Sequence, residues 1–150
     1  MNRIITLDEN NKIKFSYDIR NHIWLYVKMI FLDDNGDIIY FTDEDDYKNF
    51  IFDTGAQNTI ISKKRANECG YLNLPVQEVV TAGGIGGGSL RCIRIKIPNV
   101  TITKNLIINK PSVLVSDDYS ININILGQDI LKPYSYYLDA KQQYIYFDMN

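Results

Sequence analysis

Apolar residues along this chain recur in short runs rich in Ile, Val, Tyr and Thr, and these runs are separated by Asn, Asp, Gly and Pro. Runs of this length and composition are typical of β-strands joined by turns. The last run, 136–148, predicts a hairpin that turns between Ala140 and Gln143. The other expected strands are 22–32, 37–41, 50–52, 77–82, 89–97, 100–108, 112–115 and 121–126. The pattern therefore predicts an all-β domain.

Turn and helix signals divide these strands. The Asn35-Gly36 pair predicts that the runs on its two sides form a hairpin, because Asn-Gly favours tight hairpin turns. The segment 62–70 predicts a helix, with Ser62 as its N-cap and Gly70 placed to end it. We also expect a short helical turn in the segment GQDIL, 127–131.

Composition limits the function classes. With 150 residues the chain fits one domain, 1–150, which at this size buries roughly 68–70% of the surface that the unfolded chain exposes. A formal charge of −2 and a pI of about 5.3 give no basic field, so neither nucleic acid nor an anionic membrane is an expected partner. The N-terminal segment lacks the apolar region of a signal peptide, which favours a cytoplasmic location.

No residue pattern indicates a metal site. Cys69 and Cys92 lie outside any metal-ligand spacing, and we interpret both as reduced packing residues. The acidic clusters 33–37 and 43–46 do not fit a calcium-binding loop. The single histidine, His22, has no partner His or Cys and is interpreted as structural.

The stretch FDTGAQNT places a carboxylate, Asp53, directly after the apolar run 50–52. An ionised carboxylate is costly to bury alone, so it needs hydrogen-bond donors, a partner charge or a proton. Gly55 can expose its backbone N–H, and the Thr54 hydroxyl can brace the turn. The triplet alone is a weak signal, because an Asp at the end of a strand is more often a turn former than a catalyst.

Two further segments follow in the chain. The first, AGGIGGGS at 82–89, joins two predicted strands and contains five glycines in six positions, which predicts a mobile hairpin tip. It lacks the Lys-Ser/Thr of a P-loop and the register of a dinucleotide fingerprint, so a phosphate site is not favoured. The second, ILGQDIL at 125–131, surrounds Gly127 and Asp129 with apolar residues.

In this order, the three segments resemble those of the retropepsins, the single-lobe aspartic proteases of retroviruses and their cellular relatives. IFDTGAQNTIIS is similar to the catalytic loop of that family, GGIGG to the flap tip and ILGQDIL to the segment that closes the core. The resemblance covers residues 50–131. It implies a closed, retropepsin-like β-barrel with a flap hairpin and one or two short helices.

The resemblance also implies roles for the catalytic loop. Asp53 would be the catalytic acid, Thr54 would hydrogen-bond to the loop of a partner subunit, and Gly55 would offer its carbonyl to a peptide substrate. Ala56 and Gln57 would line the substrate cleft.

The same resemblance assigns a flap and a support. Gly127 and Asp129 would pack behind the catalytic loop. Ile85 would lie at the flap tip, where its backbone reaches substrate through a bound water. The flap residues implied to bind substrate are Gly83, Gly84, Ile85, Gly86 and Gly87.

Aspartic proteolysis needs two carboxyls that share a proton, one as a general base on water and the other as an acid at the scissile carbonyl. The chain has one Asp-Thr-Gly, and Asp129 lacks a following Thr-Gly. The second Asp53 must therefore come from another copy of the chain, which predicts a C2 homodimer with the cleft on its axis. No organic cofactor or metal is expected, and loss of activity is expected at high pH, where both carboxyls ionise.

The chain departs from the retroviral pattern at two places. Gln57 and Gln128 replace the Asp and Arg that often form an ion pair, which suggests an amide pair. About 19 residues follow Leu131, and this tail resembles the last hairpin of a pepsin-like lobe.

Two alternatives stay open at the level of sequence. A peptide-binding or dimerisation module could keep the fold without turnover, although such a module has no need of a carboxylate on the floor of its cleft. A plain β-barrel interaction domain would require three motifs to coincide in order by chance.

Overall fold

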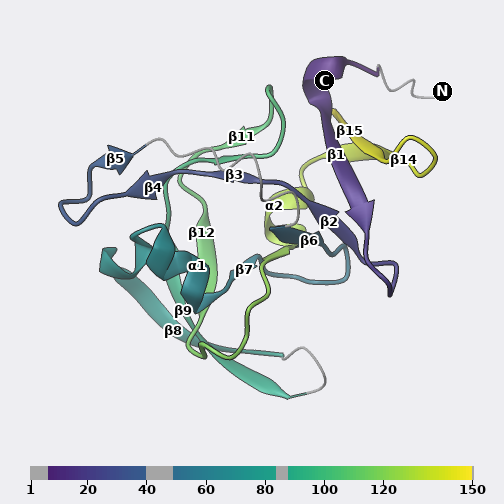
Figure 1. Ribbon diagram of the computed structural model, residues 1–150. Helices are drawn as coiled ribbons and strands as arrows, with labels where there is room; N and C mark the ends of the chain where they lie inside the picture. Colours follow the sequence, from purple (N-terminus) through teal and green to yellow (C-terminus); the bar gives the residue numbers. More distant parts are fainter. Residues whose placement is uncertain (1–6, 40–48, 84–87, 150) are drawn as a thin grey trace.

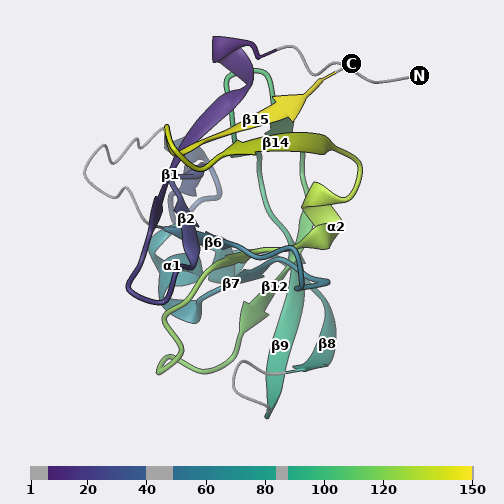
Figure 2. The same ribbon diagram turned by 90° about the vertical axis from the view of Figure 1, so that its right-hand side faces the viewer.

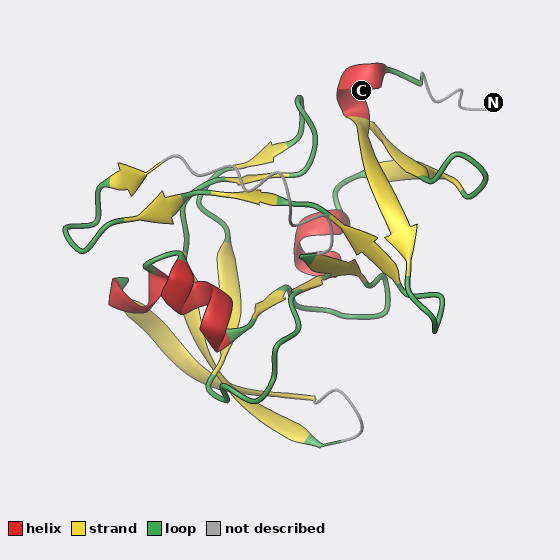
Figure 3. Cartoon of the chain, in the orientation of Figure 1, coloured by secondary structure: helices red, strands yellow, loops and turns green. Residues whose placement is uncertain are grey.

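The computed structural model describes residues 7–39, 49–83 and 88–149 of the chain. The described part is mostly β-structure with a few short helices, as Figure 3 shows. The helices are η1 (Glu9–Asn11), α1 (Lys63–Glu68), η2 (Tyr71–Asn73) and α2 (Gln128–Leu131). The strands are β1 (Lys12–Tyr17), β2 (Ile23–Leu25), β3 (Lys28–Met29), β4 (Phe31–Leu32), β5 (Ile38–Ile39), β6 (Phe50–Phe52), β7 (Ile60–Ile61), β8 (Val76–Gly83), β9 (Ser89–Lys96), β10 (Val100–Thr101), β11 (Ile107–Ile108), β12 (Ser112–Ser116), β13 (Ile125–Leu126), β14 (Ser135–Asp139) and β15 (Tyr144–Asp148).

Most strands join one sheet. Its ten strands are hydrogen-bonded in the order β14-β15-β1-β2-β6-β13-β7-β12-β9-β8, and two small sheets, β11-β10-β3 and β4-β5, lie beside it (Figure 1). The prediction of an all-β fold is confirmed. Closure of the sheet into a barrel stays a prediction, because the described pairings run from β14 to β8 without joining these two ends.

The centre of the sheet brings together segments that are far apart in sequence. β13 pairs in parallel with β6, with Leu126 opposite Phe52, and also pairs antiparallel with β7. β7 in turn pairs in parallel with β12. β6, which leads into Asp53, is thus held directly beside β13, which leads into Gly127.

The β8–β9 hairpin and the β14–β15 hairpin project from opposite ends of the molecule, as Figures 1 and 2 show. The β8–β9 hairpin is the predicted flap, and its strands are paired from Val76 to Gly83 with a bulge after Val76. Gly83 is exposed at the end of β8. The other predicted flap residues, Gly84, Ile85, Gly86 and Gly87, lie outside the described residues.

Several predicted elements are confirmed. α1 begins after Ser62, whose hydroxyl accepts from the N–H of Arg65, and the chain turns at Gly70 with φ of 78°. A Cβ at Gly70 would lie 2.4 Å from the Leu32 carbonyl oxygen, so glycine is required for space as well as for backbone geometry. GQDIL forms the helical turn α2, and the tail forms the β14–β15 hairpin.

The predicted strand 22–32 is broken into three short strands, each with a different partner. β2 pairs with β1 and β6, β3 with β10, and β4 with β5. The hairpin prediction around Asn35-Gly36 is confirmed for β4 and β5. The first break, between β2 and β3, lies where the backbone of Val27 bonds to the buried side chain of Asn49 in place of a ladder contact.

Two other predicted strands were too long. The run 100–108 folds back on itself as the hairpin β10–β11, with the Leu106 N–H bonded to the Thr103 hydroxyl. In the run 121–126 only Ile125 and Leu126 form a strand, because Asn124 is buried with its side chain bonded across the sheet.

The interior contains two clusters of apolar side chains. The larger cluster extends from Phe15 and Phe147 through Phe50 to Val113, and the smaller one includes Leu114. Cys69 lies in the larger cluster and Cys92 in the smaller one, and both are free thiols. Desolvation raises the pKa of Cys69 to about 12. The interpretation of both cysteines as packing residues is confirmed, because both side chains are fully buried.

Candidate active site

Asp53 stands at the carboxyl end of β6, where a tight turn begins. Its backbone N–H donates to the Leu126 carbonyl (3.1 Å), and its own carbonyl accepts from the N–H of Ala56 (3.2 Å). The N–H of Gly55 donates to the Asp53 side-chain atom Oδ1 (3.0 Å). A Cβ at Gly55 would lie 3.3 Å from that oxygen, so a glycine lets the backbone approach the carboxylate closely. The predicted residues Thr54 and Gly55 are exposed beside it.

The two predicted support residues, Gly127 and Asp129, contact the same loop from behind. The Asp129 carboxylate accepts from the Thr59 N–H (2.9 and 3.0 Å) and from the Thr59 hydroxyl (2.7 Å). That hydroxyl accepts in turn from the Gly127 N–H (3.0 Å). A Cβ at Gly127 would lie 2.5 Å from the carbonyl oxygen of Asn58, so the loop can sit this close only over a glycine. Thr59, which is 2% exposed, is the centre of this network.

The two glutamines of the predicted amide pair do not bond to each other through their side chains. The Gln128 side-chain amide donates to the Thr54 carbonyl (2.8 Å) instead. Backbone contacts hold the rest of the loop: the Gln128 N–H donates to the Ala56 carbonyl (2.8 Å), and the Asp129 N–H donates to the Gln57 carbonyl (3.0 Å). The amide-pair prediction is wrong, because Gln128 reaches across the turn to backbone next to Asp53.

Two buried asparagines that the sequence did not indicate brace the strands around the site. The Asn124 side chain accepts from the Ser62 N–H (2.8 Å) and donates to the Asn49 carbonyl (2.8 Å). The Asn49 side chain accepts from the Val27 N–H and donates to the Val27 carbonyl. These bonds join the start of α1 to the strands on both sides of β6. No spacing rule reveals them, because each asparagine finds its partners far along the chain.

A pocket of about 600 Å³ opens beside Asp53. One wall is apolar, from β6 and the segment before and within β13, and the other wall is the turn between β1 and β2. The residues that line it are Asp18, Ile19, Arg20, Asn21, His22, Ile23, Trp24, Ile51, Phe52, Asp53, Ile123 and Ile125. The predicted catalytic carboxylate thus lies at the edge of a space large enough for side chains of an extended peptide.

Asp18 is the other carboxylate in this pocket, and its oxygens are already engaged. Oδ1 accepts from the N–H groups of Arg20 (2.8 Å) and His22 (2.9 Å). Oδ2 accepts from the Trp24 indole N–H (2.9 Å) and lies 3.1 Å from Nδ1 of His22. The bond from Trp24, followed by those from the His22 and Arg20 backbone, lowers the pKa of Asp18 to about 2. A carboxylate held ionised in this way is a poor partner for sharing a proton with Asp53.

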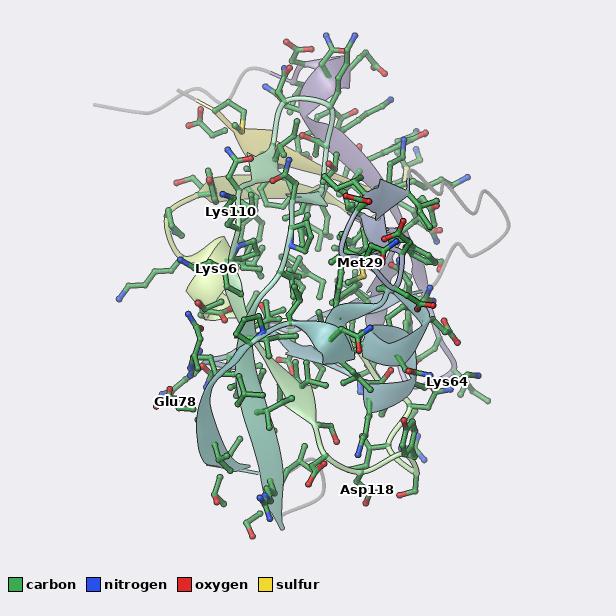
Figure 4. The ribbon with its side chains drawn as sticks, turned by 90° about the vertical axis from the view of Figure 1, so that its left-hand side faces the viewer. Met29, Lys64, Glu78, Lys96, Lys110 and Asp118 are labelled. Carbon is green, nitrogen blue, oxygen red and sulfur yellow. The ribbon has the colours of Figure 1, made fainter. Side chains whose placement is uncertain are left out.

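A second pocket, of about 680 Å³, shares no lining residue with the first. It is mainly apolar, between the β4–β5 hairpin and the outer parts of β8 and β9, and Lys96 and Lys110 line it (Figure 4). Glu78 on β8 forms an ion pair with Arg94 on β9 (2.7 Å). In the described part of the chain, no three His, Cys, Asp or Glu side chains are grouped closely enough to hold a metal ion.

Comparison with known protein families identifies the family of this chain. Residues 44–133 match the model of the gag-polyprotein putative aspartyl protease family. The chain belongs to this family. The match covers the Asp53 loop, the β8–β9 hairpin and α2, which are the segments that the sequence resemblance indicated. A comparison with curated proteins gave no significant match.

Solved structures show the fold of this family member. A retropepsin-like aspartic protease from Rickettsia conorii superimposes with a TM-score of 0.54 at 16% identity, over 91% of this chain and 92% of that chain. The EIAV protease in complex with the inhibitor HBY-793 gives a TM-score of 0.52 at 23% identity, over 79% of this chain and 92% of that chain. The prediction of a retropepsin fold is therefore confirmed.

None of the helices in the described residues has the length and hydrophobicity to cross a membrane. The single histidine, His22, was predicted to have a structural role. It bonds to Asp18 in the β1–β2 turn, and about half of its side chain is exposed. The sequence did not predict that this turn would face Asp53. The Asp18-x-x-Asn21 spacing is a turn signal, but its position beside the cleft depends on how β1 and β2 pair.

Proposed function

We propose that this family member is an aspartic endopeptidase that works as a homodimer, with the Asp53 carboxyls of two protomers sharing a proton and activating a water. The observation that carries the proposal is the position of Asp53: a carboxylate at a strand end, accepting from the Gly55 N–H, at the edge of a pocket of about 600 Å³. Catalysis requires such a group to be held rigidly at a water-accessible place where substrate can lie.

The need for a second copy follows from the carboxylates available. Asp129 accepts three hydrogen bonds from Thr59 behind the loop. The donors that bond to Asp18 lower its pKa and so hold this carboxylate in its ionised form. Neither is available to share a proton with Asp53. A twofold axis beside Asp53 supplies an identical carboxyl, and like charges about 3 Å apart cannot both ionise. The pair then contains one acid and one base, which is the arrangement that peptide hydrolysis needs.

The remaining site residues take roles around this pair. Thr54 and Gly55 are exposed next to Asp53, where they face a partner loop and the substrate backbone. In this proposal Ala56 and Gln57 contact the substrate outside the described pocket, and the flap residues Gly83, Gly84, Ile85, Gly86 and Gly87 bind it as the family resemblance implies. Gly127 and Asp129 support the loop from behind through Asn58 and Thr59. An extended peptide would add to the flap as a further strand.

The test is cleavage of a diverse peptide library at mildly acidic pH by the wild type and by Asp53→Asn, with sedimentation measured on the same samples. We expect the wild-type dimer to cleave and the variant dimer to lose at least about a thousandfold in kcat/KM, since the general base and the proton are both lost. Asp34→Asn, which changes a carboxylate in the β4–β5 turn outside the pocket, is the matched control.

A folded wild-type dimer that cleaves nothing across pH would contradict the proposal and favour a peptide-binding module with the same fold. Equal cleavage by the wild type and Asp53→Asn would also contradict it.

A further inference from the structure

The β1–β2 turn is built more firmly than its exposed position requires. Five residues, Asp18–His22, reverse the chain, with Asn21 in the left-handed region at φ of 63°. The Asp18 N–H donates to the His22 carbonyl (3.1 Å), and the Asn21 N–H donates to the Asp18 carbonyl (3.0 Å). The Asp18 carboxylate adds bonds from two backbone N–H groups of the turn and from Trp24 on β2. The backbone of the turn is therefore fixed relative to the strand that runs beside β6.

This firm backbone presents two exposed side chains, Ile19 and Arg20. Ile19 is 100% exposed, and Arg20 is exposed as well. Within the described ranges, none of the ion pairs involves Arg20. An isoleucine and a guanidinium that point into solvent contribute little to the stability of the fold. Its features are those of a surface that contacts something else.

The turn faces the same space as Asp53. Ile19 and Arg20 line one side of the pocket, and Ile51, Ile123 and Asp53 line other parts of it. The pocket therefore combines an apolar wall with a cationic group that has five N–H donors in a planar fork. A glutamate side chain matches this combination, because its methylene groups contact the isoleucines while its carboxylate accepts two hydrogen bonds from a guanidinium.

We propose that Arg20 makes this pocket a subsite for an acidic side chain, so that the protein selects peptides with Glu or Asp in the residue that occupies it. The inference rests on the proposed function only in placing a peptide across Asp53. Asp18 in the same pocket leaves the Arg20 guanidinium available, because its two carboxylate oxygens accept from the turn and from Trp24, and none of the ion pairs in the described residues joins it to Arg20. Asp18 acts as a positioning residue for Arg20.

A binding measurement tests this inference separately from catalysis. It uses the Asp53→Asn variant of the 150-residue chain, which would hold a peptide without cutting it. The probes are fluorescent decapeptides in which Glu or Gln is placed at each position in turn. We expect one position at which Glu is bound about tenfold more tightly than Gln, as is typical of a hydrogen bond to a charged group. Adding Arg20→Gln should reduce this ratio to about one while the affinity for the Gln peptide is kept.

Two further variants sharpen the test. Arg20→Glu should reverse the preference toward Lys at the same position. Lys96→Gln removes one positive charge from the other pocket and should leave the Glu-to-Gln ratio unchanged, which excludes a general effect of net charge.

A Glu-to-Gln ratio near one at every position, or a ratio that survives Arg20→Gln, would overturn the inference. A preference that is present in binding while the wild type cleaves no peptide would support the subsite and contradict the proposed protease. Cleavage that depends on Asp53 but shows no acidic preference would support the proposed protease and contradict the subsite.

Discussion

Thr59 shows how much of the candidate site depends on a single side chain. Its N–H and hydroxyl both donate to Asp129, and its hydroxyl also accepts from Gly127. One threonine thus links the segment after the catalytic loop to the start of α2. Because Thr59 and Gly127 are buried, water cannot replace the bond from the Gly127 N–H when the hydroxyl is removed.

We predict that Thr59→Val, which keeps the shape of the side chain, lowers the free energy of unfolding by about 1–3 kcal/mol, because the Gly127 N–H is left buried without an acceptor. Urea unfolding followed by tryptophan fluorescence measures this loss. Thr59→Ser keeps the hydroxyl and should cost clearly less. If Thr59→Val cost no more than Thr59→Ser, the hydrogen bonds of the hydroxyl would not be what holds the loop.

At the scale of elements, the β1–β2 turn is held by a charge. The pKa of Asp18 is lowered from 3.8 to about 2 in the folded protein, mainly by the bond from the Trp24 indole. A carboxyl with a depressed folded-state pKa stabilises the fold above its unfolded-state pKa, and this contribution is lost as pH falls through the folded-state value. The turn that carries Arg20 therefore becomes weaker in acid.

We predict that the wild type loses stability more steeply than Asp18→Asn as pH falls from about 4 to about 2, because the variant has no proton to take up at this position. Thermal melts at several pH values measure the two slopes. Asp34→Asn, whose carboxyl makes no hydrogen bond within the described residues, should follow the wild type. Parallel curves for the wild type and Asp18→Asn would show that the carboxylate does not hold the turn.

At the scale of the whole molecule, the site is one half of what the proposed chemistry requires. The pocket beside Asp53 contains one carboxyl that is free to share a proton, and the described sheet places no second Asp-Thr-Gly loop near it. If activity needs two protomers, it depends on protein concentration, and a chain without the catalytic carboxyl acts as an inhibitor of its partner.

We predict that a ninefold excess of Asp53→Asn lowers the activity per wild-type chain to about one tenth at concentrations where all chains are dimeric, because only about one in ten wild-type chains then pairs with another. Peptide cleavage after subunit exchange measures this loss, and an unrelated protein at the same concentration is the control. Unchanged activity per wild-type chain would mean that one protomer contains the complete site.

The sequence by itself determined the family and the local elements of this protein. The Asp-Thr-Gly loop, the glycine-rich flap and the ILGQDIL segment indicated the family, because each needs particular residues at fixed spacing. Ser62 and Gly70 marked the ends of α1 for the same reason, since a cap and a left-handed turn are local requirements.

Only the tertiary structure decided which distant residues meet. The asparagines that brace β6, the bond from Gln128 to Thr54 and the division of 22–32 into three strands all depend on partners tens of residues away. The position of Arg20 in the pocket that Asp53 also lines is set by the pairing of β2 with both β1 and β6. Local patterns fix what a segment can form, whereas strand pairing fixes what it contacts, and pairing is a property of the folded chain as a whole.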